Sequence, residues 1–356
     1  PPRRAAGHRP PMTPLAARLI RQIEATGPIP VSSFMALCLT DPDDGYYTTR
    51  DPFGAAGDFV TAPEISQMFG EMLGLWIAQT WDLMGQPSRF VLAELGPGRG
   101  TLMADLLRAA GTVPGFTTAA EIWFVEASPT LRAAQRARVP GAHWVGAATQ
   151  LPDGPLITLG NEFFDALPIR QYIRADSGWS ERMVGVSNGA LSFGQTPPLP
   201  DPRLDARFGL PAPGTMVETC PAAEAVVAEL AARNSTLLAI DYGAWDGTGD
   251  TLQALQNHAY AEVLSTPGQA DLTAHVNFGA LARTGAPLKA QFTTQGAFLD
   301  RLGMTARAQA LARKDPEGIT AQHRRLTHPD EMGALFKVLA LSPPDLPPLP
   351  GFAPTP

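Results

Sequence analysis

The sequence predicts an α/β protein built on a doubly wound, mostly parallel sheet of the Rossmann-like kind. Short apolar runs alternate with helical patterns through the middle of its 356 residues, and such alternation is typical of parallel strands joined by crossover helices. A glycine-rich turn follows the first apolar run, and acidic residues stand near the ends of several others. We therefore expect one large open sheet with an N-terminal helical cap and inserted β-hairpin and helical segments.

The N-terminal part is expected to be mainly helical. Residues 1–12, rich in proline and arginine, are predicted to be a flexible extension, and residues 13–86 a helical cap that carries a long loop. Apolar residues at helical spacing predict helices over 13–26, 30–40 and 64–84. The loop at 41–66 is dense in glycine, aspartate and aromatic residues, and loops of this length inside a compact domain are usually functional or disordered.

The predicted core spans residues 87–342, and a proline-rich, irregular tail follows over 343–356. The strands of the core are expected at 89–95, 121–128, 143–147, within 155–167 and at 236–243. The helices of the core are expected at 101–110, 129–138 and 221–233. Insertions at about 170–220 and 244–285 interrupt this alternation. The first insertion contains Asn188-Gly189, a dipeptide typical of β-hairpin turns. Residues 286–303 are predicted to form a late strand that leads into a helix.

Composition excludes several kinds of partner. The net charge is −7 and no block of lysine or arginine stands out, which argues against nucleic acid. No apolar run reaches the length of a membrane span, so membrane insertion is not expected. Cys38 and Cys220 lie in unrelated contexts, which predicts no metal site and a reducing compartment. With no secretory signal pattern at the N-terminus, we expect a cytoplasmic protein.

The glycine-rich turn runs from Gly96 through Pro97, Gly98 and Arg99 to Gly100, between a predicted strand and a predicted helix. Such a turn brings backbone N–H groups of a helix N-terminus close to a ligand. No Gly-Lys-Ser/Thr is present, so a phosphate-binding P-loop is excluded. A dinucleotide fingerprint has the spacing G-x-G-x-x-G, whereas here it is G-x-G-x-G. Gly96, Pro97, Gly98 and Gly100 are candidate cofactor-binding residues.

Acidic residues at the ends of the first two predicted strands identify the kind of ligand. Glu94 precedes the turn, where a carboxylate would repel pyrophosphate but attract a cation. S-Adenosyl-L-methionine carries a sulfonium and an ammonium group, and so suits this pattern. Glu126 ends the second strand, where an acid commonly accepts hydrogen bonds from ribose hydroxyls. We therefore predict S-adenosyl-L-methionine as the cofactor; the alternative is a tight turn that binds nothing.

Polar side chains after the fourth predicted strand are the catalytic candidates. Glu162 and Asp165 could orient a guanidinium through paired hydrogen bonds, with Glu162 the first choice. Asn161 could bond a neutral nitrogen, and Asp165 could instead cap the next helix. His275 is a further candidate, although a lone histidine is as often structural. Asp241 lies near the end of the fifth predicted strand, at the same edge of the sheet.

Several stretches in order resemble the MidA-like family of S-adenosylmethionine-dependent methyltransferases. Among them are GDFVTAPEISQMFGE (57–71), ELGPGRGTLMADLLR (94–108), VEASPTLRAAQ (125–135), NEFFDALPIRQY (161–172), DLTAHVNF (271–278) and TTQGAFLDRLG (293–303). The resemblance spans residues 13–340. Mitochondrial members of this family are complex I assembly factors that act as protein arginine methyltransferases.

The resemblance implies a class I methyltransferase fold and a protein substrate, namely a quinone-site subunit of NADH dehydrogenase; a homodimer is left open. It also implies a loop that closes over the cofactor, with Gly57, Asp58, Phe59 and Thr61 as candidate contacts. Two positions depart from the expected pattern: Ala62 stands in place of a serine, and Asn277 in place of an aspartate. The alternatives are methylation of a small molecule, a nicotinamide oxidoreductase, which the glycine spacing and Glu94 disfavour, and a non-catalytic assembly factor.

Overall fold

A computed structural model describes residues 12–49 and 61–353, and the chain divides into two compact units. The smaller unit comprises residues 1–52, 168–219 and 248–274, and the larger unit comprises 53–167, 220–247 and 275–356. The segment 13–86 predicted as one cap is thus shared between the units. Its last helices belong to the larger unit because their apolar side chains lie in the core of that unit.

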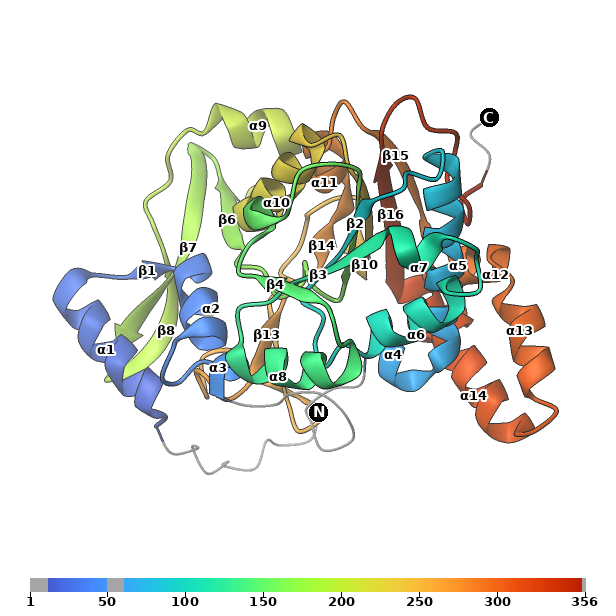
Figure 1. Ribbon diagram of the computed structural model, residues 1–356. Helices are drawn as coiled ribbons and strands as arrows, with labels where there is room; N and C mark the ends of the chain where they lie inside the picture. Colours follow the sequence, from blue (N-terminus) through green and yellow to red (C-terminus); the bar gives the residue numbers. More distant parts are fainter. Residues whose placement is uncertain (1–11, 50–60, 354–356) are drawn as a thin grey trace. The chain divides into compact units, whose positions relative to one another are not determined.

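The larger unit is built on one sheet with the order β15-β16-β10-β5-β2-β3-β4. Neighbours from β10 to β4 pair in parallel, whereas β16 pairs antiparallel with both β10 and β15. The strands are β2 (Phe90–Leu95), β3 (Ala120–Val125), β4 (His143–Val145), β5 (Leu156–Asn161), β10 (Thr236–Ala244), β15 (Lys289–Thr294) and β16 (Phe336–Ser342), and the short β14 (Val276–Asn277) pairs with β10. The predicted α/β fold with a mostly parallel sheet is confirmed (Figure 1).

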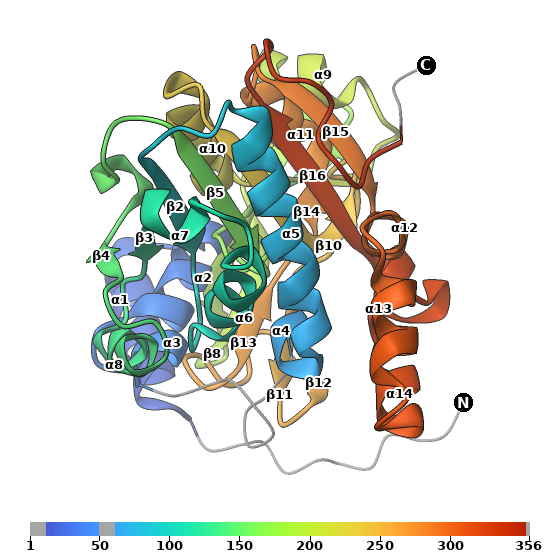
Figure 2. The same ribbon diagram turned by 45° about the vertical axis from the view of Figure 1, so that its right-hand side comes forward.

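Helices cover both faces of this sheet, as expected for a doubly wound fold. One buried apolar cluster contains residues of α5, α6, α12 and α13, and the other contains residues of α10 and α11. The helices are α4 (Ala62–Ile65), α5 (Gln67–Leu83), α6 (Thr101–Ala110), α7 (Phe116–Ala119), α8 (Pro129–Arg138), α10 (Pro221–Ala232), α11 (Phe278–Thr284), α12 (Gln295–Arg301), α13 (Met304–Leu311) and α14 (Pro316–Thr327). Figure 2 shows α5 and α6 side by side in front of the central strands.

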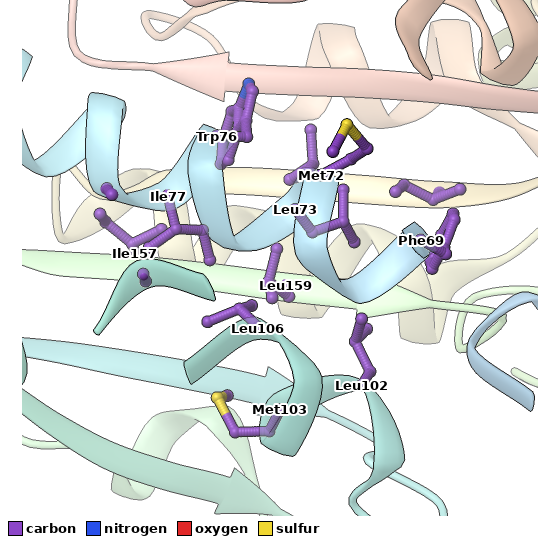
Figure 3. Close-up of a cluster of buried hydrophobic side chains, with 14 of the residues drawn as sticks. Phe69, Met72, Leu73, Trp76, Ile77, Leu102, Met103, Leu106, Ile157 and Leu159 are labelled. Carbon is purple, nitrogen blue, oxygen red and sulfur yellow. The ribbon is translucent and has the colours of Figure 1, made fainter. Parts of the chain in front are cut away.

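Small residues let α5 and α6 approach closely. A Cβ added to Gly74 would lie 2.5 Å from the carbonyl oxygen of Leu106, and one added to Gly70 would lie 2.5 Å from the Cβ of Asp105. Large apolar side chains fill the space between these helices and the sheet, as Figure 3 shows for Leu73 and Leu159. The predicted helix 64–84 is interrupted because the Ser66 hydroxyl accepts the Met68 N–H and begins α5 there.

A buried carboxylate joins three helices of the larger unit. Glu71 of α5 is 5% exposed and accepts hydrogen bonds from Arg307 Nε (2.7 Å) on α13 and from Arg108 Nη1 (3.0 Å) on α6. Burial raises the pKa of Glu71, but the hydrogen bonds from Arg307 and Arg108 more than offset this, so the pKa lies below its usual value. This ion triad therefore stabilises the helical layer over the sheet.

Glu71→Gln is expected to lower the free energy of unfolding by about 1–2 kcal/mol at neutral pH, because both arginines are partly exposed and water screens part of the interaction. A depressed pKa contributes stability above the unfolded-state value, and this contribution is lost as the pH falls through the folded-state value. The difference between wild type and variant should therefore shrink below about pH 4.5. Chemical denaturation at several pH values measures it; a constant difference would contradict the ionic explanation.

The smaller unit is built on antiparallel strands. Its sheet has the order β1-β7-β6-β9, with β8 paired to β7, and a second sheet has the order β12-β11-β13. The elements are α1 (Pro14–Thr26), β1 (Ile29–Pro30), α2 (Val31–Thr40), α3 (Tyr46–Thr49), β6 (Arg170–Ala175), β7 (Gly178–Ser187), β8 (Ala190–Gln195), α9 (Pro202–Phe208), β9 (Met216–Thr219), β11 (Gln253–Gln256), β12 (Ala259–Ala261) and β13 (Asp271–Thr273). The predicted hairpin turn is confirmed: Asn188 (φ +51°) and Gly189 (φ +71°) both have positive φ.

Candidate active site

The glycine-rich turn has a left-handed backbone that glycine can adopt without strain. Gly96, Gly98 and Gly100 have φ values of +59°, +52° and +78°, a region that side chains with a Cβ rarely occupy. The Gly100 N–H donates to the carbonyl oxygen of Pro97 at 2.8 Å and closes the turn. Helix α6 begins at the next residue, so the turn presents the N-terminus of a helix at the carboxyl end of β2.

Glu94 lies in β2 directly before this turn. Its side chain is 3% exposed, and its Oε2 atom has no hydrogen-bond partner among the described residues. Burial raises the pKa of this carboxyl to about 8. A buried oxygen without a partner is costly unless a ligand satisfies it. The ammonium group of S-adenosylmethionine could donate a hydrogen bond to this oxygen and has the opposite charge to a carboxylate, so Glu94 fits the cofactor.

Glu94→Gln is expected to stabilise the ligand-free protein increasingly as the pH rises. A carboxyl with a raised pKa contributes stability below its unfolded-state value of 4.5, and this stability is lost as the pH rises towards about 8. Glutamine cannot ionise, so the variant should gain a few kcal/mol relative to wild type between about pH 5 and about pH 9. Denaturant titrations of both proteins at these two pH values measure the gain; equal pH dependence would contradict the burial of a titrating Glu94.

Glu126 follows β3, the neighbour of β2, at the same edge of the sheet. Its Oε1 accepts the Ser128 N–H at 2.7 Å, and its Oε2 accepts a proton of Gln135 Nε2 at 3.1 Å. Burial raises the pKa of Glu126, while these two hydrogen bonds lower it. A carboxylate has about four acceptor positions, so this one retains capacity for two ribose hydroxyls. Gln135 lies at the end of the stretch VEASPTLRAAQ, and no sequence pattern predicts a role for it.

The segment after β5 carries the catalytic candidates in an unusual backbone conformation. Glu162 has φ +50°, which is rare for a residue other than glycine, and its N–H donates to the carbonyl oxygen of Ile240 at 2.9 Å. Its Oε1 accepts from the Ala62 N–H at 3.0 Å and from Asn161 Nδ2 at 3.3 Å. Burial raises the pKa of Glu162 to about 7, and the charge of Asp165 adds to the shift. Strain of this kind gathers at functional sites.

Asp165 and Asp241 are buried beside the half-buried Glu162, and the three acids form a largely buried acidic cluster. The Tyr242 hydroxyl donates to Asp165 Oδ2 at 2.6 Å, and Asp241 Oδ2 accepts the N–H groups of Phe164 (3.0 Å) and Asp165. Burial raises the pKa of Asp165 to about 6 and that of Asp241 well above its usual value, in the latter case with a contribution from the other two acids. Asp165 Oδ1 is buried without a hydrogen-bond partner.

Across residues 12–49 and 61–353, neither lysine nor arginine forms an ion pair with any member of this acidic cluster (Glu162, Asp165 and Asp241). Buried carboxylates usually pair with a cation, because isolated charges are costly to bury. The cluster also touches the glycine-rich turn through Phe163: a Cβ added to Gly96 would lie 2.9 Å from Phe163 Cδ2. The acids and the turn therefore belong to one site.

His275 and Asn277 lie near this site and make different contacts. The His275 ring meets the Tyr242 ring edge-on, with centroids 5.6 Å apart, and the side chain is exposed. Partial burial, together with the charge of Lys337, lowers the pKa of His275. Asn277 is the N-cap of α11, and its Oδ1 accepts the Ala280 N–H at 2.9 Å. An aspartate at this position could accept the same hydrogen bond. The departure at Asn277 therefore leaves the start of α11 capped.

The predicted closing loop falls mostly outside the described residues: Gly57, Asp58 and Phe59 are not among them. Thr61 is described and is buried at the position before α4, where its hydroxyl makes no capping hydrogen bond. Its carbonyl oxygen accepts the Glu64 and Ile65 N–H groups, at 2.9 and 3.2 Å. The described ranges hold no group of three or more His, Cys, Asp or Glu side chains placed to bind a metal ion.

Known proteins resemble this chain in sequence and in fold. Residues 72–296 match a family described as "Putative S-adenosyl-L-methionine-dependent methyltransferase". A Drosophila melanogaster relative, "Protein arginine methyltransferase NDUFAF7 homolog, mitochondrial", is 37% identical and covers 92% of this chain and 85% of its own. The Homo sapiens protein arginine methyltransferase NDUFAF7 is 34% identical and covers 94% and 84%. A Burkholderia thailandensis structure bound to S-adenosyl-homocysteine has a TM-score of 0.80 at 31% identity and covers 92% and 91%.

The fold and the site together define an S-adenosylmethionine-dependent methyltransferase, and the expected cofactor is confirmed. The chain belongs to the methyltransferase family whose model it matches, and the predicted MidA-like assignment is confirmed. The residues that bind the cofactor and those that take part in methyl transfer stay predictions.

The expectation of a cytoplasmic protein is contradicted, because the relatives are named as mitochondrial. A low cysteine count separates reducing from oxidising compartments, and it does not distinguish the cytoplasm from other reducing compartments. A secretory signal pattern does not bear on other kinds of targeting. As for membranes, the described helices are all too short or too polar to span one.

Proposed function

We propose that this protein methylates an arginine side chain of a protein substrate, with the guanidinium held by the buried acidic cluster. The observation that carries the proposal is the group of three carboxylates, Glu162, Asp165 and Asp241, none of which pairs with a lysine or arginine of the described chain. The relatives named as protein arginine methyltransferases support the same acceptor.

The charge of the cluster suits a cationic acceptor. Burial raises the pKa of all three acids, and the charges of neighbouring acids add to the shift for Glu162 and Asp241, so part of the cluster holds protons near neutral pH. A guanidinium would lower these pKa values again and could bond a carboxylate through two parallel N–H groups. A neutral small molecule would leave the carboxylates without a counter-charge. The cluster therefore selects for a positively charged, forked donor.

The same acids can accept the proton that the acceptor nitrogen must lose. S-Adenosylmethionine, when bound, supplies an electrophilic methyl group, while the turn from Gly96 to Gly100, with Glu94 and Glu126, would hold it. Glu162, with a pKa of about 7, is well matched to orient the acceptor and to accept a proton near neutral pH. Tyr242 fixes Asp165 through its 2.6 Å hydrogen bond, which leaves Asp165 Oδ1 free for the acceptor.

The protein substrate is proposed to be a quinone-site subunit of NADH dehydrogenase. The test is transfer of tritiated methyl from S-adenosylmethionine in lysate of the source organism, with wild-type protein and with an inactive variant. Label in a single protein band, followed by mass spectrometry that places the methyl groups on arginine, is the expected result. Label confined to the small-molecule fraction, or methyl groups on another amino acid, would overturn the proposal.

A further inference from the structure

Gln135 is the one fully buried side chain of α8, and it lies between the two halves of the cofactor site. Its exposed fraction is 0%. Burying a side-chain amide without partners is costly, so each of its polar atoms should be satisfied. Its hydrogen bonds lead to three different elements: the glycine-rich turn, the end of β3 and strand β4.

The contacts determine which way the amide faces. Gln135 Oε1 accepts the indole N–H of Trp144 at 2.8 Å. Because an indole nitrogen only donates, the amide oxygen must face Trp144 and the amino group must face the opposite way. There, Nε2 donates to the carbonyl oxygen of Gly98 at 2.7 Å and to Glu126 Oε2 at 3.1 Å. Both amide protons therefore form hydrogen bonds, and both acceptors belong to the cofactor site.

From this arrangement we infer that Gln135 is a positioning residue for the cofactor, tying the glycine-rich turn to the carboxylate proposed to bind the ribose. The inference depends on the assignment of Glu126 to the cofactor and not on the identity of the methyl acceptor. Gln135 holds one oxygen of Glu126 while the Ser128 N–H holds the other, so the carboxylate plane is set before a ligand arrives. Preorganisation of this kind lowers the cost of binding.

A neutral amide suits this task better than a charged side chain. A lysine or arginine here would pair with Glu126 and compete for its lone pairs. A glutamate would place a second acceptor against Gly98 O and Glu126, which would repel both. Glutamine orients the acid and leaves its charge available. The turn also packs on this part of α8, since a Cβ added to Gly100 would lie 3.5 Å from Gln135 Cα.

A purely structural glutamine would affect folding stability alone. A matched control variant separates this structural role from the proposed positioning role. Gln295 is also 0% exposed and bonds through Nε2 to Leu326 O at 2.9 Å, but it lies in α12, which follows β15 at the opposite edge of the sheet. Gln135→Met and Gln295→Met remove the same amide from an equally buried place. Both should lower the melting temperature.

The test is the affinity of each full-length variant for S-adenosylhomocysteine, measured by titration calorimetry. We expect Gln135→Met to weaken binding by about tenfold to a hundredfold and Gln295→Met to leave it near that of wild type. In combination with Glu126→Gln, the loss from Gln135→Met should be much smaller, because both changes remove one interaction. Unchanged affinity in Gln135→Met, equal losses in both methionine variants, or additive losses with Glu126→Gln would each overturn the inference.

A second variant covers the case in which Gln135→Met does not fold. Gln135→Glu keeps the length and shape of the side chain and can still accept the Trp144 N–H, but it cannot donate to Gly98 O or Glu126 when ionised. Weaker binding of S-adenosylhomocysteine by this variant at neutral pH supports the positioning role, and wild-type affinity overturns it. Both measurements use ligand binding alone, so they stand apart from the arginine-acceptor proposal, which only the methyl-transfer assay tests.

Discussion

Glu162→Gln should reduce methyl transfer by about a hundredfold to a thousandfold while S-adenosylhomocysteine still binds with nearly wild-type affinity. Glutamine keeps the Oε1 acceptor for the Ala62 N–H and for Asn161, so the local backbone should persist. What the variant loses is the negative charge and the ability to accept a proton. Single-turnover transfer to the methylated protein substrate, alongside calorimetry with S-adenosylhomocysteine, measures the two effects separately.

The control for this variant is Glu71→Gln, which also neutralises a buried carboxylate of the larger unit. Glu71 is bonded to Arg108 and Arg307 instead of standing in the acidic cluster. At a temperature well below its melting point, Glu71→Gln should transfer methyl groups at the wild-type rate. Normal transfer by Glu162→Gln would remove Glu162 from the mechanism, and a parallel loss in Glu71→Gln would attribute the effect to stability.

The local pattern of residues was enough to predict most of the larger unit. Alternating apolar runs located β2, β3, β4, β5 and β10, because each is followed by a helix or a turn with recognisable chemistry. Strand β16 was not predicted as a strand. It follows a stretch of helices and pairs antiparallel between β10 and β15, so its place depends on long-range register such as Ile240 opposite Val338, which periodicity does not encode.

The side chains of the candidate site could likewise be predicted only in part from the sequence. Glu94, Glu126 and Glu162 could be found in the sequence because each stands at the end of a predicted strand. Gln135 could not, because an amide in the middle of a helix looks like an ordinary polar residue until its burial is known. The left-handed backbone of Glu162 was equally hidden, since only the bond from its N–H to Ile240 O shows what holds it there.

Gly98→Val is expected to abolish cofactor binding. Gly98 has φ +52°, where a β-branched residue is strongly disfavoured, and its carbonyl oxygen accepts the hydrogen bond from Gln135. A valine would either strain the turn or rotate it, and rotation would withdraw that carbonyl and move the backbone N–H groups at the start of α6. Calorimetry with S-adenosylhomocysteine should then show no measurable heat of binding.

The expected loss of binding comes from the place of Gly98 in the cofactor site and not from backbone strain alone. Gly141→Val is the control that separates these two causes. Gly141 has φ +91° with no atom within 4 Å of an added Cβ, and it lies in the loop after α8, away from the turn. It should carry a similar backbone cost, about 1–2 kcal/mol, and a lower melting temperature, yet bind the ligand. Undiminished affinity in Gly98→Val would remove the turn from the cofactor site. Loss of binding in both variants would mean that strain anywhere in this unit is sufficient, and the specific claim on Gly98 would fail.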